Sequence, residues 1–241
     1  MKTRRIRIIG EMIEKTWAVD DLLSPVSIRA DRIRLIEELG DRLSSFPHSR
    51  FEQRDQLLVL RQKRLRRSPN RPKGAKLKQV LLSLAAELDL ASAMGFVHGD
   101  ICYKNTIWDG DRIWLVDLEP DLHHRRDGVE KWMVTIPWVA HCDLRMGMVS
   151  SATDRISFAA LCRRMLYGMP PQLNFRAYFT KRRHSDASLP WGISDSTVEG
   201  RTFTELAEDS FEGIGRSNVP WAEPRVLAGC GDKVDDKNSL F

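Results

Sequence analysis

The sequence predicts an α+β fold, in which a strand-containing amino-terminal part precedes a mainly helical carboxy-terminal part. Short apolar runs typical of strands occur up to Leu60, whereas from Leu77 the apolar residues recur every three or four positions, as on amphipathic helices. The chain has 241 residues, of which 42% are hydrophobic. This is enough for one large domain or for two tightly joined lobes with a core.

The amino-terminal part is predicted to combine strands with one helix. Residues 4–19 hold two β-prone stretches separated by a glycine, which predicts one hairpin or two short strands. Residues 28–43 have the apolar spacing of an amphipathic helix, seen at Ile33, Ile36, Leu39 and Leu43. Gly40 and Pro47 mark where this helix weakens and stops. The apolar run over residues 56–60 is suited to a buried strand.

A basic stretch follows these elements. Residues 61–78 contain nine basic residues and no acidic one, and Pro69 and Pro72 interrupt them. We interpret the stretch as an exposed linker, so that residues 1–75 form the amino-terminal unit. Such a charge run is either a solvated surface or a contact for a phosphate-rich partner, nucleic acid included. Aromatic residues are lacking among these charges, so base stacking has little support.

The carboxy-terminal part begins with a long predicted helix. Its apolar stripe comprises Leu77, Val80, Leu81, Leu84, Leu88 and Ala91. Gly95 is placed to cap the end of this helix. A further helix is predicted from Thr153 to Leu166. Residues 76–228 then form the second lobe, and residues 229–241 are predicted to be a flexible tail.

Polar residues flank a predicted hairpin in this second lobe. The chain runs out from Asn105, turns at Asp109-Gly110, and returns through an apolar run to Asp117. Asn105 and Asp117 should therefore lie side by side at the open end of the hairpin. An amide oxygen and a carboxylate so placed suit Mg²⁺, which takes few protein oxygens and the rest from phosphates and water. Asp100 precedes the hairpin and is predicted to face a hydroxyl acceptor at the same end.

The residues around the hairpin form a known pattern. His98-Gly99-Asp100 is followed by Asn105, and the next apolar strand ends in Asp117. This HxDxxxxN arrangement resembles the signature of the protein-kinase-like superfamily, with features of small atypical bacterial-type kinases. The resemblance implies a two-lobed fold with a reduced amino-terminal lobe, and ATP and Mg²⁺ between the lobes. It also implies that His98 braces the catalytic loop, that Asp100 is the catalytic base, and that the Asn and the second Asp bind the metal.

Further residues have roles that this resemblance implies. The segment Thr153 to Leu161 resembles the kinase segment in which a buried Asp accepts hydrogen bonds from the catalytic-loop backbone, which gives Asp154 a structural role. An Asp near a helix start is equally an ordinary cap. A strand Lys and a helix Glu position the nucleotide in the family, and Lys15 with Glu37 or Glu38 are the candidates here. The alternative for each of these charges is a solvated surface position.

Several features depart from the family pattern. The nucleotide-covering GxGxxG loop is absent. The usual Asp-Phe-Gly is replaced by Asp117-Leu118-Glu119, similar to the Asp-apolar-Glu sequences of aminoglycoside and choline kinases. Cys102 stands where serine/threonine kinases have a lysine. The segment around Asp154 favours a protein substrate, whereas these departures favour a small-molecule acceptor.

Composition limits the class of protein and its location. The 38 basic against 33 acidic residues give a net charge of +5, which suits an anionic partner such as a nucleotide, nucleic acid or lipid. The four cysteines are widely spaced and lack C-x-x-C or zinc-ligand register, which favours free thiols in the cytoplasm. The apolar stretches are too short for a signal peptide or a transmembrane helix.

We therefore expect a Mg-ATP-dependent phosphotransferase that moves the γ-phosphate to a hydroxyl acceptor, by preference a protein serine or threonine. The close alternative is a small-molecule, sugar or lipopolysaccharide kinase. Two other classes are a pseudokinase that binds without turnover and a basic RNA-associated protein. The last class predicts an RNA affinity that falls steeply with salt.

Overall fold

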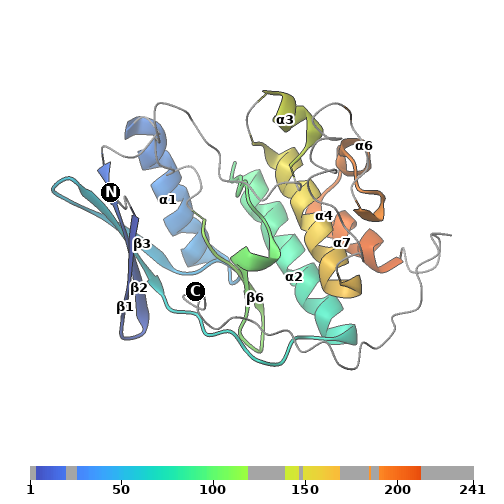
Figure 1. Cartoon of the computed structure of the whole chain (residues 1–241), viewed down its shortest axis with the longest axis horizontal. Coiled ribbons are helices and arrows are strands. Elements are labelled where there is room, and N and C mark those ends of the chain that lie inside the picture. The colour runs from blue at the N-terminus through green and yellow to red at the C-terminus, as the bar shows by residue number, and fades with distance from the viewer. Residues whose placement is uncertain are drawn as a thin grey trace.

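The structure, a computed structural model, confirms the α+β class. It describes residues 4–19, 26–118, 139–146, 149–168, 185 and 190–212. A four-stranded antiparallel sheet with one helix forms the amino-terminal part, and a mainly helical region follows. Figure 1 shows the sheet and its helix at one end of the molecule and the other helices at the opposite end.

The sheet holds the predicted hairpin. Its strands are β1 (Arg4–Ile9), β2 (Met12–Ala18), β3 (Ser49–Arg54) and β4 (Leu57–Lys63). They lie in the order β1-β2-β4-β3, and all neighbours are antiparallel. The turn between β1 and β2 contains Gly10 with a φ of 60°, a conformation that glycine adopts without a steric penalty. Trp17, Leu58 and Leu60 form a small buried cluster on the sheet.

Helix α1 (Val26–Arg42) confirms the helix expected over residues 28–43. It packs against β3 and buries Ile36 and Leu39 in the main core. The chain returns close beside its last turn, because a Cβ at Gly40 would lie 2.6 Å from the carbonyl oxygen of Pro47. This close approach requires a glycine and directs the chain from the helix into β3.

One strand of this region was not predicted, and one prediction about it needs correction. The sequence does not predict β3, because Phe51 is the single large apolar residue among its polar and charged ones. Pairing with β4 along the whole strand defines it instead. The expected linker over residues 61–78 is too long, since β4 extends to Lys63 and α2 begins at Gly74. The basic residues at the two ends of that stretch occupy the exposed faces of these regular elements.

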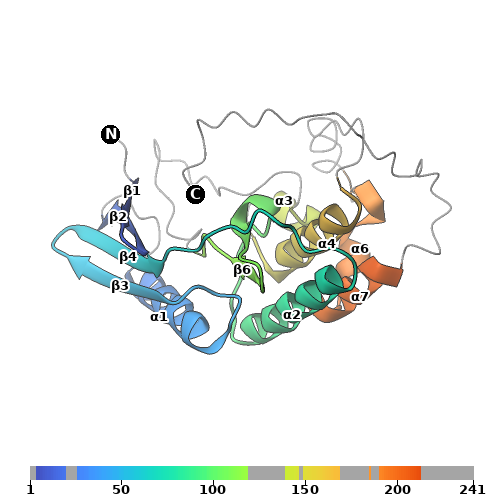
Figure 2. The same cartoon turned by 90° about the horizontal axis from the view of Figure 1, so that it is seen from below.

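The helical region confirms the predicted helices over residues 77–91 and 153–166. Its helices are α2 (Gly74–Ala93), α3 (His141–Met146), α4 (Ser151–Tyr167), α6 (Asp195–Val198) and α7 (Phe203–Glu212). Figures 1 and 2 show α2 and α4 beside α7, and both pack against it. Gly95 follows the end of α2 with a φ of 83°, as expected of a glycine after a helix.

A short hairpin lies between the sheet and these helices (Figure 1). It consists of β5 (Thr106–Trp108) and β6 (Ile113–Leu115), as predicted. The expected turn at Asp109-Gly110 is in fact the longer connection 109–112, because Asp109 Oδ1 accepts hydrogen bonds from two backbone N–H groups of that segment. The backbone N–H of Leu115 donates to the carbonyl of Ser45 over 2.8 Å and so attaches the hairpin to the amino-terminal part.

Within the described ranges, no helix is long and apolar enough to cross a membrane. The predicted tail over residues 229–241 lies outside those ranges, and so does Glu119. The change from strands to helices falls in the irregular segment 64–73, close to the expected boundary between residues 75 and 76.

Candidate functional site

The loop between α2 and β5 is held in place by Asp154. This carboxylate, from α4, is 2% exposed. Its Oδ2 accepts a hydrogen bond from the backbone N–H of His98 at 2.6 Å, and its Oδ1 accepts one from Gly99 at 2.7 Å. The cap of α4 is Ser150, whose hydroxyl accepts from the N–H of Ala152. Of the two roles considered for Asp154, the contacts are therefore those of a loop anchor.

His98 braces the same loop against β6 from inside the protein. Its ring is fully buried, and Nδ1 accepts a hydrogen bond from the backbone N–H of Asp100 at 3.1 Å. The ring proton therefore lies on Nε2, which donates to the carbonyl of Val116 at 3.1 Å. Burial lowers the pKa of His98, so the ring is neutral at physiological pH. A neutral histidine of this tautomer links Asp100 to the residue that precedes Asp117.

Asn105 orients the carboxylate of Asp100. Its amide nitrogen donates to Asp100 Oδ2 and to the carbonyl of Asp100, each over 2.9 Å. The backbone carbonyl of Asn105 accepts from the N–H of Val116 at 2.9 Å, which brings the two ends of the hairpin together as expected. Within the described residues Asn105 Oδ1 makes no hydrogen bond, so this oxygen is available as a ligand.

Asp117 occupies a strained backbone position and reaches the sheet. Its φ of 62° lies in the left-handed region, where residues other than glycine are uncommon and often functional. Its Oδ1 lies 2.9 Å from Nζ of Lys15, whose side chain is 8% exposed. This ion pair connects β2 of the sheet to the end of the β5–β6 hairpin.

The expected pairing of Lys15 with Glu37 or Glu38 needs correction. Lys15 contacts Asp117 instead. Glu37 Oε1 accepts a hydrogen bond from the backbone N–H of Phe51 at 2.7 Å, which ties α1 to β3. Glu38 pairs with Arg42 one turn further along the same helix. The physical reason is that the Glu37 carboxylate is bound by a backbone N–H of β3, whereas the Lys15 ammonium lies within hydrogen-bond distance of Asp117.

Arg32 was missed by the sequence analysis. This side chain of α1 is 8% exposed, and its Nη2 donates to the carbonyls of Val97 at 2.7 Å and Leu118 at 3.2 Å. Its guanidinium carbon lies 4.3 Å from the centroid of the Phe96 ring. Arg32 thus joins α1 to the segments before Asp100 and after Asp117. Its helical spacing to Ile36 and Leu39 places it on the apolar face of α1, and this was the available signal.

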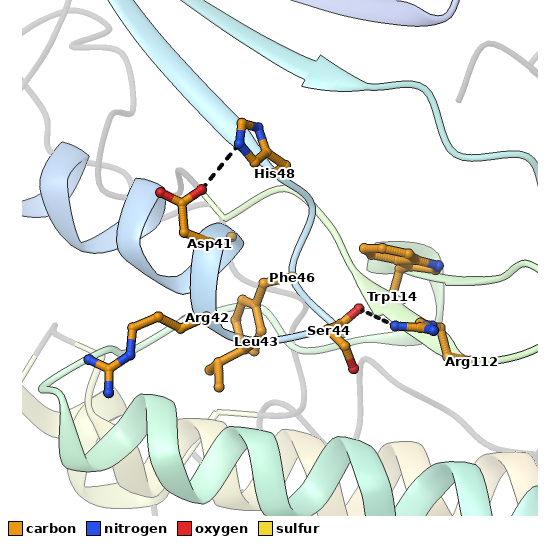
Figure 3. A pocket seen from close by; sticks show the side chains of 9 residues that line it. Asp41, Arg42, Leu43, Ser44, Phe46, His48, Arg112 and Trp114 are labelled. Carbon is orange, nitrogen blue, oxygen red and sulfur yellow. Dashed lines mark hydrogen bonds and ion pairs between the residues drawn. The ribbon is translucent and has the colours of Figure 1, made fainter.

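A pocket of about 260 Å³ lies away from these residues. Figure 3 shows it between the end of α1, the start of β3 and the β5–β6 hairpin. His48 Nε2 lies 3.1 Å from Asp41 Oδ1 on one side, and Arg112 donates to the carbonyl of Ser44 on the other. None of the candidate site residues lines it, so we attach no functional role to it.

The site presents oxygen atoms that are suited to bind a metal ion. Groups of three or more His, Cys, Asp or Glu residues that could hold a metal ion do not occur among the described residues. Asn105 and Asp117 together offer an amide oxygen and a carboxylate at one end of the hairpin. Such a set suits a hard divalent cation that keeps water or phosphate as its other ligands.

Comparisons with known proteins add no relative. No protein-family model matches the chain, and no curated protein gives a significant match. The functional conclusion consequently depends on the residues and contacts described above.

Proposed function

We propose that this protein is a protein-kinase-like phosphotransferase that moves the γ-phosphate of ATP to a hydroxyl, by preference that of a protein serine or threonine. One observation carries the proposal. The HxDxxxxN pattern and the later Asp117 are brought to one end of a hairpin, where Asn105 holds the carboxylate of Asp100. Lys15 reaches Asp117 from the sheet. Phosphoryl transfer requires mainly positioning and neutralisation of charge, which these groups are suited to provide.

In this proposal Asp100 is the base that receives the proton of the attacking hydroxyl. The hydrogen bond from Asn105 Nδ2 fixes Oδ2 and so orients the carboxylate that would receive the proton. Asp154 and His98 act through the loop, because they hold the backbone on either side of Gly99. These two are positioning residues.

Asn105 and Asp117 would hold Mg²⁺ through their side-chain oxygens. When bound, the ion neutralises the negative charge of the phosphates. The oxygen of Asn105 that makes no hydrogen bond within the described residues supports this assignment, and so does the exposure of the Asp117 side chain, which is 39%.

Lys15 and the exposed isoleucines of β1 are suited to the nucleotide. Lys15 pairs in register with Ile6, and Ile13 pairs with Ile8, so these side chains share one face. Ile6 and Ile8 are 41% and 48% exposed. A lysine for the phosphates beside uncovered apolar side chains for the base is an arrangement that fits ATP.

A second acceptor class has one observation in its favour. Cys102 occupies the loop position where serine/threonine kinases have a lysine, and it is 7% exposed. A small-molecule kinase acting on a sugar, an antibiotic or a lipopolysaccharide hydroxyl does not require that lysine. A pseudokinase would bind the nucleotide without transferring phosphate. An RNA-associated protein would neither bind ATP nor transfer phosphate.

Binding of ATP with and without Mg²⁺ tests the proposal. We expect Mg-ATP to raise the melting temperature of the wild-type protein, since a ligand of the native state stabilises it. Asp117→Ala should remove most of this increase, whereas Asp111→Ala, an exposed aspartate on the β5–β6 connection, should keep it. The proposal would be contradicted if Mg-ATP raised the melting temperatures of the two variants equally. It would also be contradicted if the protein bound RNA instead of ATP and Asp117→Ala left the RNA affinity unchanged.

A further inference from the structure

Three arginines surround the ring of Tyr103, beside the candidate catalytic loop. We call Arg67, Arg71 and Arg164 the arginine cluster. Their guanidinium carbons lie 6.0, 5.2 and 4.6 Å from the ring centroid. Two of them come from the irregular basic segment 64–73, and the third comes from α4. Segments far apart in the sequence thus bring positive charge to one ring.

The charge of this cluster is not balanced by carboxylates. Within the part of the chain that the structure describes, Arg71 and Arg164 form no ion pair, and Arg67 donates to the carbonyl of Thr106 at 3.0 Å. Neighbouring Arg66 behaves differently, because it forms an ion pair of 2.6 Å with Glu11. Contacts with an aromatic face are worth about 0.5–1 kcal/mol at exposed sites and do not neutralise charge. Like charges gathered in this way favour a bound anion.

Tyr103 places the positive charge of the arginine cluster next to the candidate catalytic loop. Tyr103 begins the short 3-10 helix Tyr103–Asn105, directly after the segment that carries Asp100. Its hydroxyl makes no hydrogen bond to any described residue and offers one more donor. Lys104 follows it and is exposed. Because Tyr103 follows Asp100 by three residues, an anionic group bound here suits a molecule whose hydroxyl approaches Asp100.

We propose that the arginine cluster binds a phosphate monoester on the acceptor, so that the substrate is a hydroxyl compound that already carries a phosphate group. This inference rests on the proposed phosphotransferase function. Guanidinium groups match phosphate in geometry and form charge-assisted hydrogen bonds with it. A nucleic-acid strand fits less well, because guanidinium groups already cover the Tyr103 ring that would have to stack on a base.

The test is a binding measurement without nucleotide or magnesium. O-phosphoserine and glucose 6-phosphate are titrated by calorimetry against the wild-type protein, with serine and glucose as unphosphorylated partners. We expect the phosphorylated probes alone to bind, and Arg71→Gln and Arg164→Gln each to weaken their binding by about tenfold or more. The difference between the two probes distinguishes a phosphopeptide-like acceptor from a sugar phosphate.

Matched arginines serve as controls. Arg66→Gln alters the same segment as Arg71, and Arg163→Gln alters α4 at a side chain that donates to the carbonyl of Asp209. Both should bind the probes as the wild type does. Arg71 is exposed, so its substitution leaves folding intact, which thermal melting checks.

Several results would overturn the inference. They are an absence of binding to the wild type, equal losses in cluster and control variants, and binding of single-stranded RNA in place of the phosphate probes. Because the titration uses no ATP, the two proposals fail separately. Cluster-dependent binding without phosphotransfer contradicts the proposed function, whereas phosphotransfer without cluster-dependent binding contradicts this inference.

Discussion

A single carboxylate fixes the backbone that leads to Asp100. Asp154 is buried and accepts hydrogen bonds from two consecutive N–H groups, those of His98 and Gly99. Asp154→Ala would leave both donors buried without an acceptor, and each such group costs about 1–3 kcal/mol. We expect the free energy of unfolding to fall by about 2–5 kcal/mol, measured by urea denaturation.

An exposed aspartate provides the control for this change. Asp111 has a side chain that is 72% exposed, and Asp111→Ala should alter the free energy of unfolding by about 0.5 kcal/mol or less. If Asp154→Ala were as stable as this control, the anchor described here would be wrong.

His98 makes stability depend on pH. Burial lowers its pKa in the folded state, so below about pH 6.5 the unfolded chain takes up a proton that the folded chain resists. Stability is therefore fully present above that pH and falls below it, by at most about 1.4 kcal/mol per pH unit for one group. Urea denaturation from about pH 7.5 to about pH 5.5 should show a smaller decrease for His98→Asn than for the wild type. Identical slopes would contradict a buried neutral histidine.

Residue types in the site could be predicted from the sequence, but not all of their partners. Asp100, Asn105 and Asp117 are close in sequence, and a local hairpin brings them together. The partner of Lys15 depends on how the sheet is set against the hairpin, which no local pattern encodes. The contacts of Arg32 could not be predicted either, because they are made with backbone carbonyls of segments distant in the sequence.

At the level of elements, a carboxylate of α2 anchors α7. Asp89 accepts hydrogen bonds from the N–H groups of Phe203 at 2.6 Å and Thr204 at 3.1 Å, which lie at the start of α7. Asp89→Ala should lower the free energy of unfolding by about 1–3 kcal/mol, since helix N-terminal donors lose their acceptor. Thermal or urea unfolding measures this loss. An unchanged midpoint would show that α7 does not depend on this contact.

Elements with strong hydrophobic periodicity were predictable, and those without it were not. The helices α1, α2 and α4 and the hairpin β1–β2 have clear apolar patterns. Strand β3 has only Phe51 as a large apolar residue, and its pairing with β4 comes from the tertiary fold. The β5–β6 connection is longer than expected, because the side chain of Asp109 stabilises a wider turn.

At the level of the whole molecule, the Lys15–Asp117 ion pair joins the sheet to the site. The Asp117 side chain is 39% exposed, so solvent screens the pair and its loss should cost about 1 kcal/mol or less. We expect Lys15→Met to keep most of the stability but to lose the increase in melting temperature produced by Mg-ATP. Lys63→Met, an exposed change on β4, should retain that increase. A full response of Lys15→Met would exclude Lys15 from nucleotide binding.

The most direct test of the phosphotransferase proposal is transfer of labelled γ-phosphate from ATP in the presence of Mg²⁺. Purified wild-type protein is compared with Asp100→Ala and Asp117→Ala, by ATP consumption, self-labelling and labelling of the phosphorylated acceptors above. We predict measurable transfer by the wild type and a decrease of about a hundredfold or more in each variant. Folded wild-type protein that transfers no phosphate, or variants that transfer it at the wild-type rate, would contradict the account.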